Sequence, residues 1–197
     1  QGYSSAASDV YKRQQLDFSV GLNLTCSAKV YVDRSELKSY RFTLYHGYKV
    51  KQVTDQTGAA LDFRREYDYV TVTRGGAAVE YLCLEYTGKS PKYYSSYAGV
   101  CLPANFAYYP IPGYRELFSD NFYGFIDCSL PYDTAFDVRC SGRKQMYCNL
   151  AARGDNHFAG NARSITLLSG YYDTLKLNDT LVVYPKSVSY THLTLPT

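Results

Sequence analysis

The sequence predicts an all-β fold, an antiparallel β-sandwich or saddle of about eleven short strands. Apolar and polar residues alternate along much of the chain with a period of two, which is typical of half-buried strands. Turn-forming residues separate these runs at short intervals. No window shows a sustained helical period, and tyrosine, which favours strands, occurs 23 times in 197 residues.

The first strand is predicted at residues 16–26, LDFSVGLNLTC. Its apolar residues fall at even positions, from Leu16 through Leu22 to Cys26, while polar residues and Gly21 fall between them. Because successive side chains of a strand point to opposite faces, this pattern places the apolar set on one face. Residues 16–26 are therefore expected to form one half-buried strand.

The same alternation predicts further strands at residues 29–32, 40–45, 49–54, 69–74, 79–86, 123–130, 135–141, 146–151, 162–170 and 179–185. Residues 55–58 (DQTG) have turn chemistry, and residues 74–76 (RGG) are a candidate hairpin turn. Residues 87–122 interrupt the alternation with a segment rich in Gly, Pro, Ser and Tyr. Loops of this length are often functional or packed by their own aromatic side chains.

Both ends of the chain differ from the sequence between them. A DNA that encodes residues 4–14 has a complementary strand that encodes residues 188–197, VSYTHLTLPT, without a mismatch. Two protein termini have no physical reason to be reverse complements, and the nucleotides resemble a transposase adapter used in library preparation. We therefore interpret residues 1–14 and 188–197 as translated adapter with disordered or arbitrary structure, and residues 15–187 as a single β domain from a gene fragment.

Charge and motifs exclude several classes of function. The net charge of +3 is too balanced to indicate binding to nucleic acid or to an anionic membrane. No stretch approaches the roughly 20 apolar residues of a membrane helix, so the segment is not expected to insert into a membrane. His46 and His157 are isolated from any zinc-binding motif, and no catalytic or metal-ligating residue is predicted. The carboxylate pairs Glu80/Glu85 and Asp127/Asp133 are better explained as solvated charges.

Tyrosine and cysteine supply the remaining candidate residues. The main interpretation of the tyrosines is β propensity and partial burial of amphipathic rings. The alternative is a stacking surface for sugars or peptides made by Tyr93, Tyr94, Tyr97, Tyr108, Tyr109 and Tyr114. The six cysteines lack zinc-ligand spacing and are expected to be buried thiols. Cys140 and Cys148 flank SGRKQMY, so a disulfide across a hairpin is an alternative if the domain is exported.

Read in order, several blocks resemble the N-terminal β domain of M-one family (gluzincin) zinc aminopeptidases. These blocks are LDFSVGLNL, YRFTLYHGYKVKQVTDQTGAALDF, VEYLCLEYTGK, FAYYPIPG, YGFIDCSLPYDTAFDVRCSG and ARSITLLSGYYDTLKLNDTLVVYPK. They are most similar to the bacterial membrane-bound branch, in which the domain accompanies an ABC-transporter permease-like region. The resemblance implies a domain that packs against a thermolysin-like catalytic domain and helps to wall the substrate cleft. It also implies that the zinc motif lies beyond this sequence.

The resemblance leads to an expected function. Residues 15–187 are expected to be noncatalytic and to contain no cofactor, whereas zinc is expected in the parent if that protein is an active aminopeptidase. The expected partners are the downstream catalytic domain and a peptide substrate, and the expected location is extracytoplasmic or membrane-associated through segments outside this sequence. Two alternatives are an exported carbohydrate- or peptide-binding module that uses residues 93–114, and a structural ectodomain of a transporter.

Overall fold

The computed structural model describes residues 13–32, 37–96, 99–115, 128–130, 132–178 and 180–186. These residues form sixteen strands and no helix, so the predicted all-β class is confirmed. No helix capable of spanning a membrane occurs in the described part of the chain. The strands are β1 (Arg13–Val20), β2 (Leu24–Tyr31), β3 (Ser39–Thr43), β4 (Tyr48–Thr54), β5 (Phe63–Glu66), β6 (Tyr69–Thr73), β7 (Tyr81–Gly88), β8 (Gly99–Leu102), β9 (Ile111–Pro112), β10 (Thr134–Ser141), β11 (Gln145–Cys148), β12 (Ala151–Gly154), β13 (His157–Ala162), β14 (Leu167–Gly170), β15 (Tyr172–Leu177) and β16 (Thr180–Pro185).

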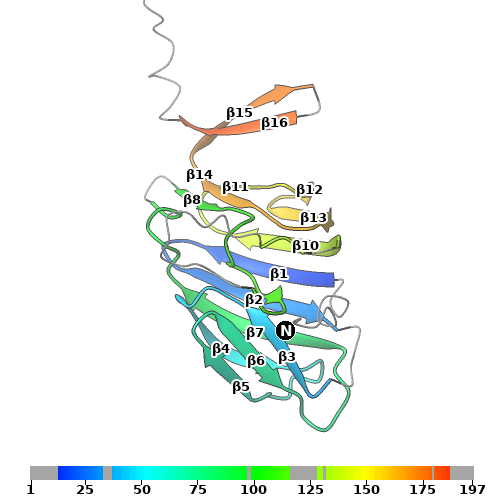
Figure 1. The fold of residues 1–197 in the computed structure, drawn as a ribbon. Helices are drawn as coiled ribbons and strands as arrows, with labels where there is room; N and C mark the ends of the chain where they lie inside the picture. Colours follow the sequence, from blue (N-terminus) through cyan, green and yellow to red (C-terminus); the bar gives the residue numbers. More distant parts are fainter. Residues whose placement is uncertain are drawn as a thin grey trace, which may run out of the picture.

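A seven-stranded sheet of order β12-β13-β10-β1-β2-β7-β4 is the centre of the fold. Its pairs are antiparallel except for β1 and β10, which run parallel, so the sheet is mixed. A four-stranded sheet (β5-β6-β3-β9) and a three-stranded sheet (β11-β14-β8) accompany it. The β15–β16 hairpin projects beyond these sheets at the top of Figure 1.

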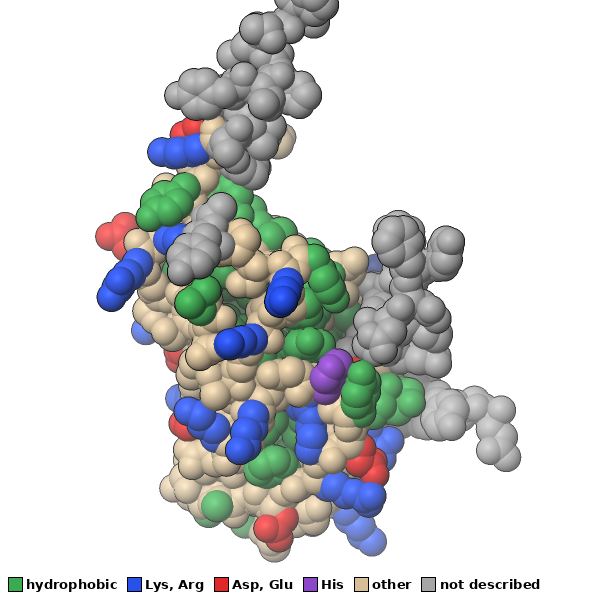
Figure 2. Space-filling model, turned by 90° about the vertical axis from the view of Figure 1, so that its left-hand side faces the viewer, with side chains coloured by type: hydrophobic (Ala, Val, Ile, Leu, Met, Phe, Trp, Pro, Cys, Tyr) green, Lys and Arg blue, Asp and Glu red, His purple; other side chains and the backbone are tan. Residues whose placement is uncertain are grey.

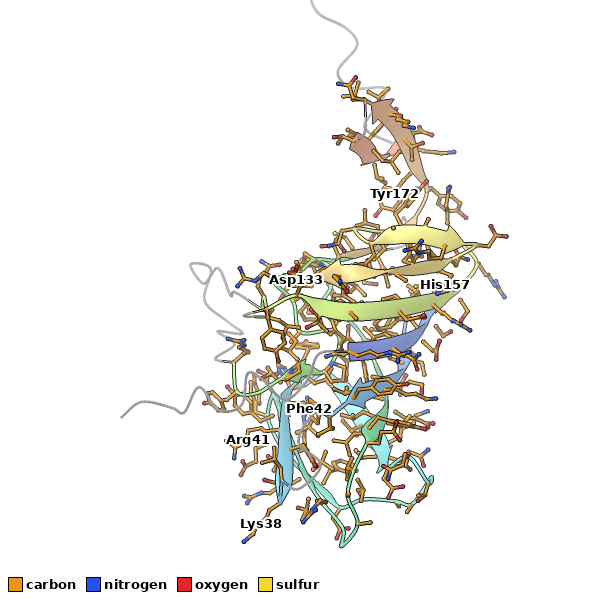
Figure 3. All side chains as sticks on the ribbon, turned by 90° about the vertical axis from the view of Figure 1, so that its right-hand side faces the viewer. Lys38, Arg41, Phe42, Asp133, His157 and Tyr172 are labelled. Atoms are coloured by element: carbon orange, nitrogen blue, oxygen red, sulfur yellow. The ribbon has the colours of Figure 1, made fainter. Side chains whose placement is uncertain are left out.

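The core lies on one face of the seven-stranded sheet. Along β1 and β2, every second side chain is buried and the intervening ones are at least partly exposed, which is the burial pattern that the alternation predicts. Both smaller sheets contribute to the same buried cluster, so they cover that face. On β3, Arg41 and Phe42 point to opposite sides, and Phe42 points inward (Figure 3). The cluster includes Leu16, Phe18, Ala28, Val30, Leu82, Leu84, Phe136 and Val138 of the large sheet, Tyr40, Phe42, Val70 and Val72 of the four-stranded sheet, and Leu102, Met146 and Leu167 of the three-stranded sheet.

The single strand predicted at residues 16–26 is wrong, because the chain turns back between Val20 and Leu24. β1 and β2 pair as an antiparallel hairpin in which Phe18 lies opposite Cys26. Leu22, expected on the buried face, lies in the turn and is 69% exposed. The turn keeps Val20 and Leu24 on the same face, so the alternation continues across it and conceals the reversal.

Several other sequence predictions also need correction. Residues 74–76 do not form a hairpin turn, because β6 and β7 belong to different sheets and the segment between them crosses from one to the other. The run at 146–151 is divided between β11 and β12, and the run at 162–170 is divided between the end of β13 at Ala162 and β14. The predicted strand at 123–130 falls mostly outside the described residues, and its last three residues are not in a strand. The turn at residues 55–58 is present, with Gly58 at φ 83° and the Asp55 carboxylate accepting from the Thr57 amide at 2.8 Å.

The assignment of the two ends to adapter stays a prediction. Residues 1–12 and 187–197 lie outside the described part of the chain. Arg13 and Gln14 do belong to β1, where Gln14 is buried and pairs with Val30. The Gln14 amide donates to the Pro110 carbonyl at 3.1 Å, but its Oε1 atom has no hydrogen-bond partner among the described residues.

Candidate functional site

Tyr108 and Tyr109 of the predicted stacking surface are completely buried. They belong to the segment between β8 and β9, which fills the core beneath the large sheet. The Tyr108 ring packs 5.7 Å from that of Phe18 on β1, and the Tyr109 ring packs 5.8 Å from that of Phe136 on β10. Both rings are therefore part of the core and have no surface with which to contact a ligand.

Hydrogen bonds fix this buried segment to both sides of the core. The Tyr86 hydroxyl of β7 donates to the Tyr108 carbonyl at 2.8 Å, and the Tyr108 hydroxyl donates to the Ile165 carbonyl at 2.9 Å. Burial raises the pKa of Tyr86 and of Tyr108 well above the ordinary tyrosine value, because the ionised phenolate would be desolvated. These phenols therefore act as structural donors rather than as acids or bases.

The other predicted tyrosines do not form one surface. Tyr93 is 75% exposed and contacts Tyr94 edge to face, whereas Tyr94 is half-buried against Phe106. Tyr114 is 58% exposed but stacks on Tyr69 of the four-stranded sheet. Tyr97 lies outside the described residues.

Two tyrosines that the prediction omitted lie beside Tyr93 and Tyr94. Tyr171 and Tyr172 follow β14, and together these four residues line a small cavity of about 170 Å³. Tyr171 is 65% exposed. The sequence places the two pairs far apart, so only the pairing of β14 with β8 brings them together.

Cys140 and Cys148 are separate thiols in this structure. Burial raises the pKa of the Cys140 thiol to about 12, and the neighbouring Cys148 contributes to the same shift. Burial also raises the pKa of Cys148. Neither thiol is therefore activated as a nucleophile, since reactive cysteines have a lowered pKa. Their disulfide stays a prediction for oxidising conditions.

His46 is held by a buried carboxylate. Asp68, 2% exposed, accepts from the His46 backbone amide at 2.7 Å, and its Oδ1 lies 3.0 Å from His46 Nδ1. The imidazole stacks on Tyr67 at 4.2 Å and contacts Tyr45 at 4.5 Å. A carboxylate-oriented histidine can serve as a general base when it faces a nucleophile. Here the pair joins the loop after β3 to the β5–β6 turn, so we assign it a structural role.

The remaining polar candidates lie apart on the surface. His157 Nε2 is 3.2 Å from Asp137 Oδ1, and the two residues are on the neighbouring strands β13 and β10. Asp133 is exposed before β10. Asp127 lies outside the described residues. Among the residues that are described, no group of three or more His, Cys, Asp or Glu side chains could hold a metal ion.

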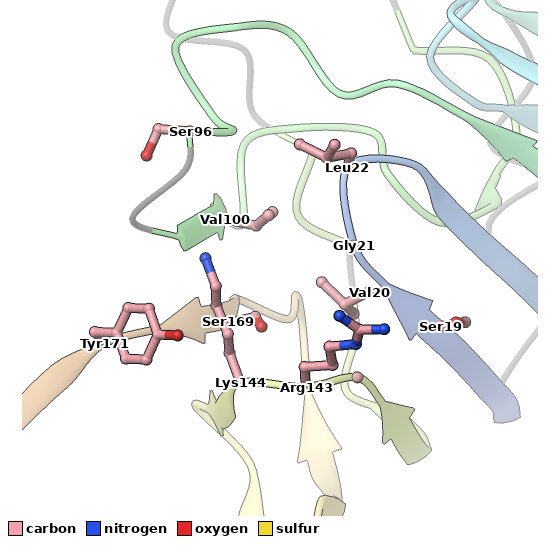
Figure 4. Close-up of a pocket in the computed structure, with 11 residues that line it drawn as sticks. Ser19, Val20, Gly21, Leu22, Ser96, Val100, Arg143, Lys144, Ser169 and Tyr171 are labelled. Atoms are coloured by element: carbon pink, nitrogen blue, oxygen red, sulfur yellow. The ribbon is translucent and has the colours of Figure 1, made fainter.

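A cavity lies where two turns and two strands meet. The β1–β2 turn, the β10–β11 turn and strands β8 and β14 enclose about 610 Å³ (Figure 4). Arg143 and Lys144 of the β10–β11 turn supply its charges, and Val20, Leu22 and Val100 supply apolar surface. None of these residues was singled out by the sequence patterns as a ligand-binding group.

The β15–β16 hairpin is the second surface feature. Leu175, Leu177, Leu181 and Val182 are each at least 37% exposed. Leu175 pairs with Val182 across the hairpin, so these two side chains share a face, while Leu181 and Val183 on the other face line a cavity of about 940 Å³ over β11 and β12. Apolar side chains thus occur on both faces of a two-stranded hairpin.

Solved structures share this fold. The sequence matches no protein-family model and no curated protein. Native leukotriene A4 hydrolase from Saccharomyces cerevisiae superposes with a TM-score of 0.56 at 9% identity, over 93% of this chain and 34% of the hydrolase. The yeast hydrolase in complex with bestatin gives 0.55 at 10% identity, over 88% and 30%. An M1 zinc metallopeptidase from Deinococcus radiodurans gives 0.50 at 17% identity, over 88% and 46%.

These likenesses concern the fold. The chain spans about a third of the yeast hydrolase and less than half of the bacterial metallopeptidase. The matching part is the N-terminal domain, so the β architecture that the M-one resemblance implies is confirmed. The membrane-bound bacterial branch stays a prediction.

Proposed function

We propose that residues 15–187 are a noncatalytic N-terminal β domain of an M1-like metallopeptidase, serving as scaffold and cleft wall for a zinc catalytic domain encoded outside this sequence. The observation that carries the proposal is the fold likeness, which extends over 93% of the chain but over only 34% of the yeast hydrolase. The proposal includes the bacterial membrane-bound branch and an extracytoplasmic or membrane-associated location.

The β15–β16 hairpin supports a docking role. A two-stranded hairpin is marginally stable in water, and exposed apolar patches mark interaction surfaces. Leu175 and Leu181 lie on opposite faces of the hairpin and are 49% and 55% exposed. We therefore assign the hairpin as the contact with the catalytic domain, which would cover both faces.

In this proposal the chemistry belongs to the catalytic domain. Zinc held by that domain would supply Lewis-acid chemistry for hydrolysis of the N-terminal peptide bond of a substrate. The residues of this chain would form one wall of the substrate cleft, without donating or accepting a proton in the reaction.

An activity assay tests the noncatalytic assignment. The purified chain is incubated with a panel of aminoacyl chromogenic substrates, with and without added Zn²⁺. No hydrolysis above the buffer rate is expected. Zinc-dependent turnover that a chelator abolishes would overturn the assignment.

Surface variants test the docking role of the hairpin. We expect the chain alone to bind an apolar fluorescent dye and to self-associate, because the side chains of Leu175 and Leu181 are exposed to solvent. The double variant Leu175→Ser, Leu181→Ser should lose most of both effects, whereas Lys49→Ser with Lys51→Ser, two exposed residues of β4, should retain them. Equal dye binding and sedimentation by the wild type and the double variant would show that the hairpin is an ordinary solvated surface.

A further inference from the structure

We propose that the 610 Å³ cavity between the β1–β2 turn, the β10–β11 turn, β8 and β14 binds a small amphipathic carboxylate, with an aryl group preferred. Its volume lies in the range of small-molecule sites, which combine apolar walls with a few polar groups. The turns lie on the left of Figure 1, the side presented by Figure 2, where basic side chains are interspersed with apolar ones. The site is separate from the scaffold role and does not depend on it.

The walls of the cavity are apolar. Val20 at the end of β1 and Val100 of β8 are each 8% exposed and form its inner surface. Leu22 and Tyr171, 69% and 65% exposed, stand at its rim. A hydrocarbon or aromatic group in the cavity would remove both rim side chains from water, which is favourable.

The charged side chains among the described residues that line the cavity are those of Arg143 and Lys144. Arg143 lies beside Val20, and Lys144 extends between Tyr171 and Val100 (Figure 4). Lys144 Nζ lies 5.1 Å from the centroid of the Tyr171 ring, a cation–π contact that holds the ammonium group at the rim. No acidic residue is among the described residues that line the cavity. A cleft with charges of one sign beside apolar walls concentrates the field, and a guanidinium matches a carboxylate in geometry.

Gly142 explains why the two cations occupy this position. A Cβ atom at Gly142 would lie 2.8 Å from the Val20 carbonyl oxygen and 2.6 Å from Met146 Cε. Real Cβ atoms do not approach a backbone oxygen so closely, so only glycine lets the β10–β11 turn lie on the end of β1. The next two residues, Arg143 and Lys144, are thereby placed at the cavity.

An aromatic surface continues from the cavity. Ser96 and Tyr171 line both this cavity and the smaller one of about 170 Å³, which Tyr93, Tyr94 and Tyr172 also line. A carboxylate bound at Arg143 and Lys144 can therefore extend its apolar part along Tyr171 toward these rings. This continuity favours aryl over alkyl carboxylates, because offset or edge contacts between aromatic rings add to the burial of area.

The test titrates the isotopically labelled full chain by NMR with 3-phenylpropionate, its neutral amide and inorganic phosphate. The carboxylate should bind saturably and shift the amide signals of Gly21 and Gly142. The amide and phosphate should each bind at least about tenfold more weakly, because each lacks one of the two interactions. A hexanoate titration should give weaker binding than 3-phenylpropionate.

Variants locate the site. Arg143→Gln with Lys144→Gln should weaken binding of 3-phenylpropionate at least about tenfold, while Lys49→Gln with Lys51→Gln, two exposed lysines on β4, should leave it unchanged. Unchanged thermal unfolding will show that the variants keep the fold. Equal binding of carboxylate and amide, equal binding of phosphate, or equal binding by the two double variants would overturn the proposal.

Discussion

Replacing Tyr108 with Phe removes one hydroxyl from the centre of the core and leaves the ring in place. The side chain is 0% exposed, and its hydroxyl donates to the Ile165 carbonyl at 2.9 Å. The ring contacts with Phe18 and Tyr109, at centroid distances of 5.7 and 5.1 Å, do not involve the oxygen. The substitution therefore isolates the hydrogen bond that joins the aromatic segment to the chain before β14.

The expected cost follows from the burial of the acceptor. Removing one partner of a buried hydrogen bond leaves the other desolvated, which costs about 1–3 kcal/mol. Water cannot replace the lost hydrogen bond, since the Tyr108 side chain and the Ile165 carbonyl both lie in the core. For a chain of this size each kcal/mol lowers the unfolding midpoint by roughly 2–4 °C. Tyr108→Phe should therefore lower the free energy of unfolding by about 1–3 kcal/mol in a urea titration.

Tyr109 provides a matched control in the adjacent position. Its hydroxyl is buried and has no hydrogen-bond partner among the described residues, and burial raises the pKa of Tyr109 well above the ordinary tyrosine value. Tyr109→Phe should therefore change stability by no more than about 0.5 kcal/mol or increase it, since removing an unpaired buried polar atom relieves its desolvation. Equal destabilisation by the two substitutions, or none by Tyr108→Phe, would refute the reasoning.

Two further predictions concern the same core. Burial raises the pKa of Tyr48 and Tyr86 in the folded state. Their contribution to stability is therefore fully present below the unfolded-state pKa of about 10, and above it the free energy of unfolding should fall by about 1.4 kcal/mol per pH unit for each phenol. Urea titrations that give a constant free energy of unfolding from pH 9 to about 11 would contradict this. Gly88→Ala should lower the free energy of unfolding by about 1–3 kcal/mol or more, because its Cβ would overlap the Gly47 carbonyl oxygen. Gly76→Ala, whose Cβ would meet nothing within 4 Å, should leave the midpoint of thermal unfolding nearly unchanged. Equal shifts of the midpoint in the two variants would contradict the close approach of β4 to β7.

The sequence predicted β4, β7 and β10 of the large sheet because their burial follows a local rule, but it missed β13, of which the predicted strand at residues 162–170 contains only the last residue. In β1 the side chains at Leu16, Phe18 and Val20 face the core, and a period of two is visible without knowing the partner strand. The reversal between β1 and β2 was not predicted because Val20 and Leu24 are both at even positions, so the alternation of apolar residues is unbroken across the turn. The short strands β5, β8 and β9 escaped because their runs are too brief to show a period.

Tertiary contacts determine which tyrosines are buried and where the cavity lies. An amphipathic ring suits either a core or a binding surface, so the sequence of residues 108–109 could not distinguish the two. The three-stranded sheet places Tyr171 beside Tyr93, and the close approach at Gly142 brings Arg143 to the end of β1. Both juxtapositions join segments distant in sequence. Local patterns therefore could not predict the cavity that we propose as a binding site.

The most direct test of the proposed function is to read the parent gene past the codon for Ser187. The account predicts that the adapter-like codons disappear and that an open reading frame continues into a helix carrying a His-Glu-x-x-His motif, the zinc site of a metallopeptidase. A stop codon in the authentic flanking DNA, or another β repeat in place of that helix, would contradict the assignment of this chain as the N-terminal β domain of an M1-like protein.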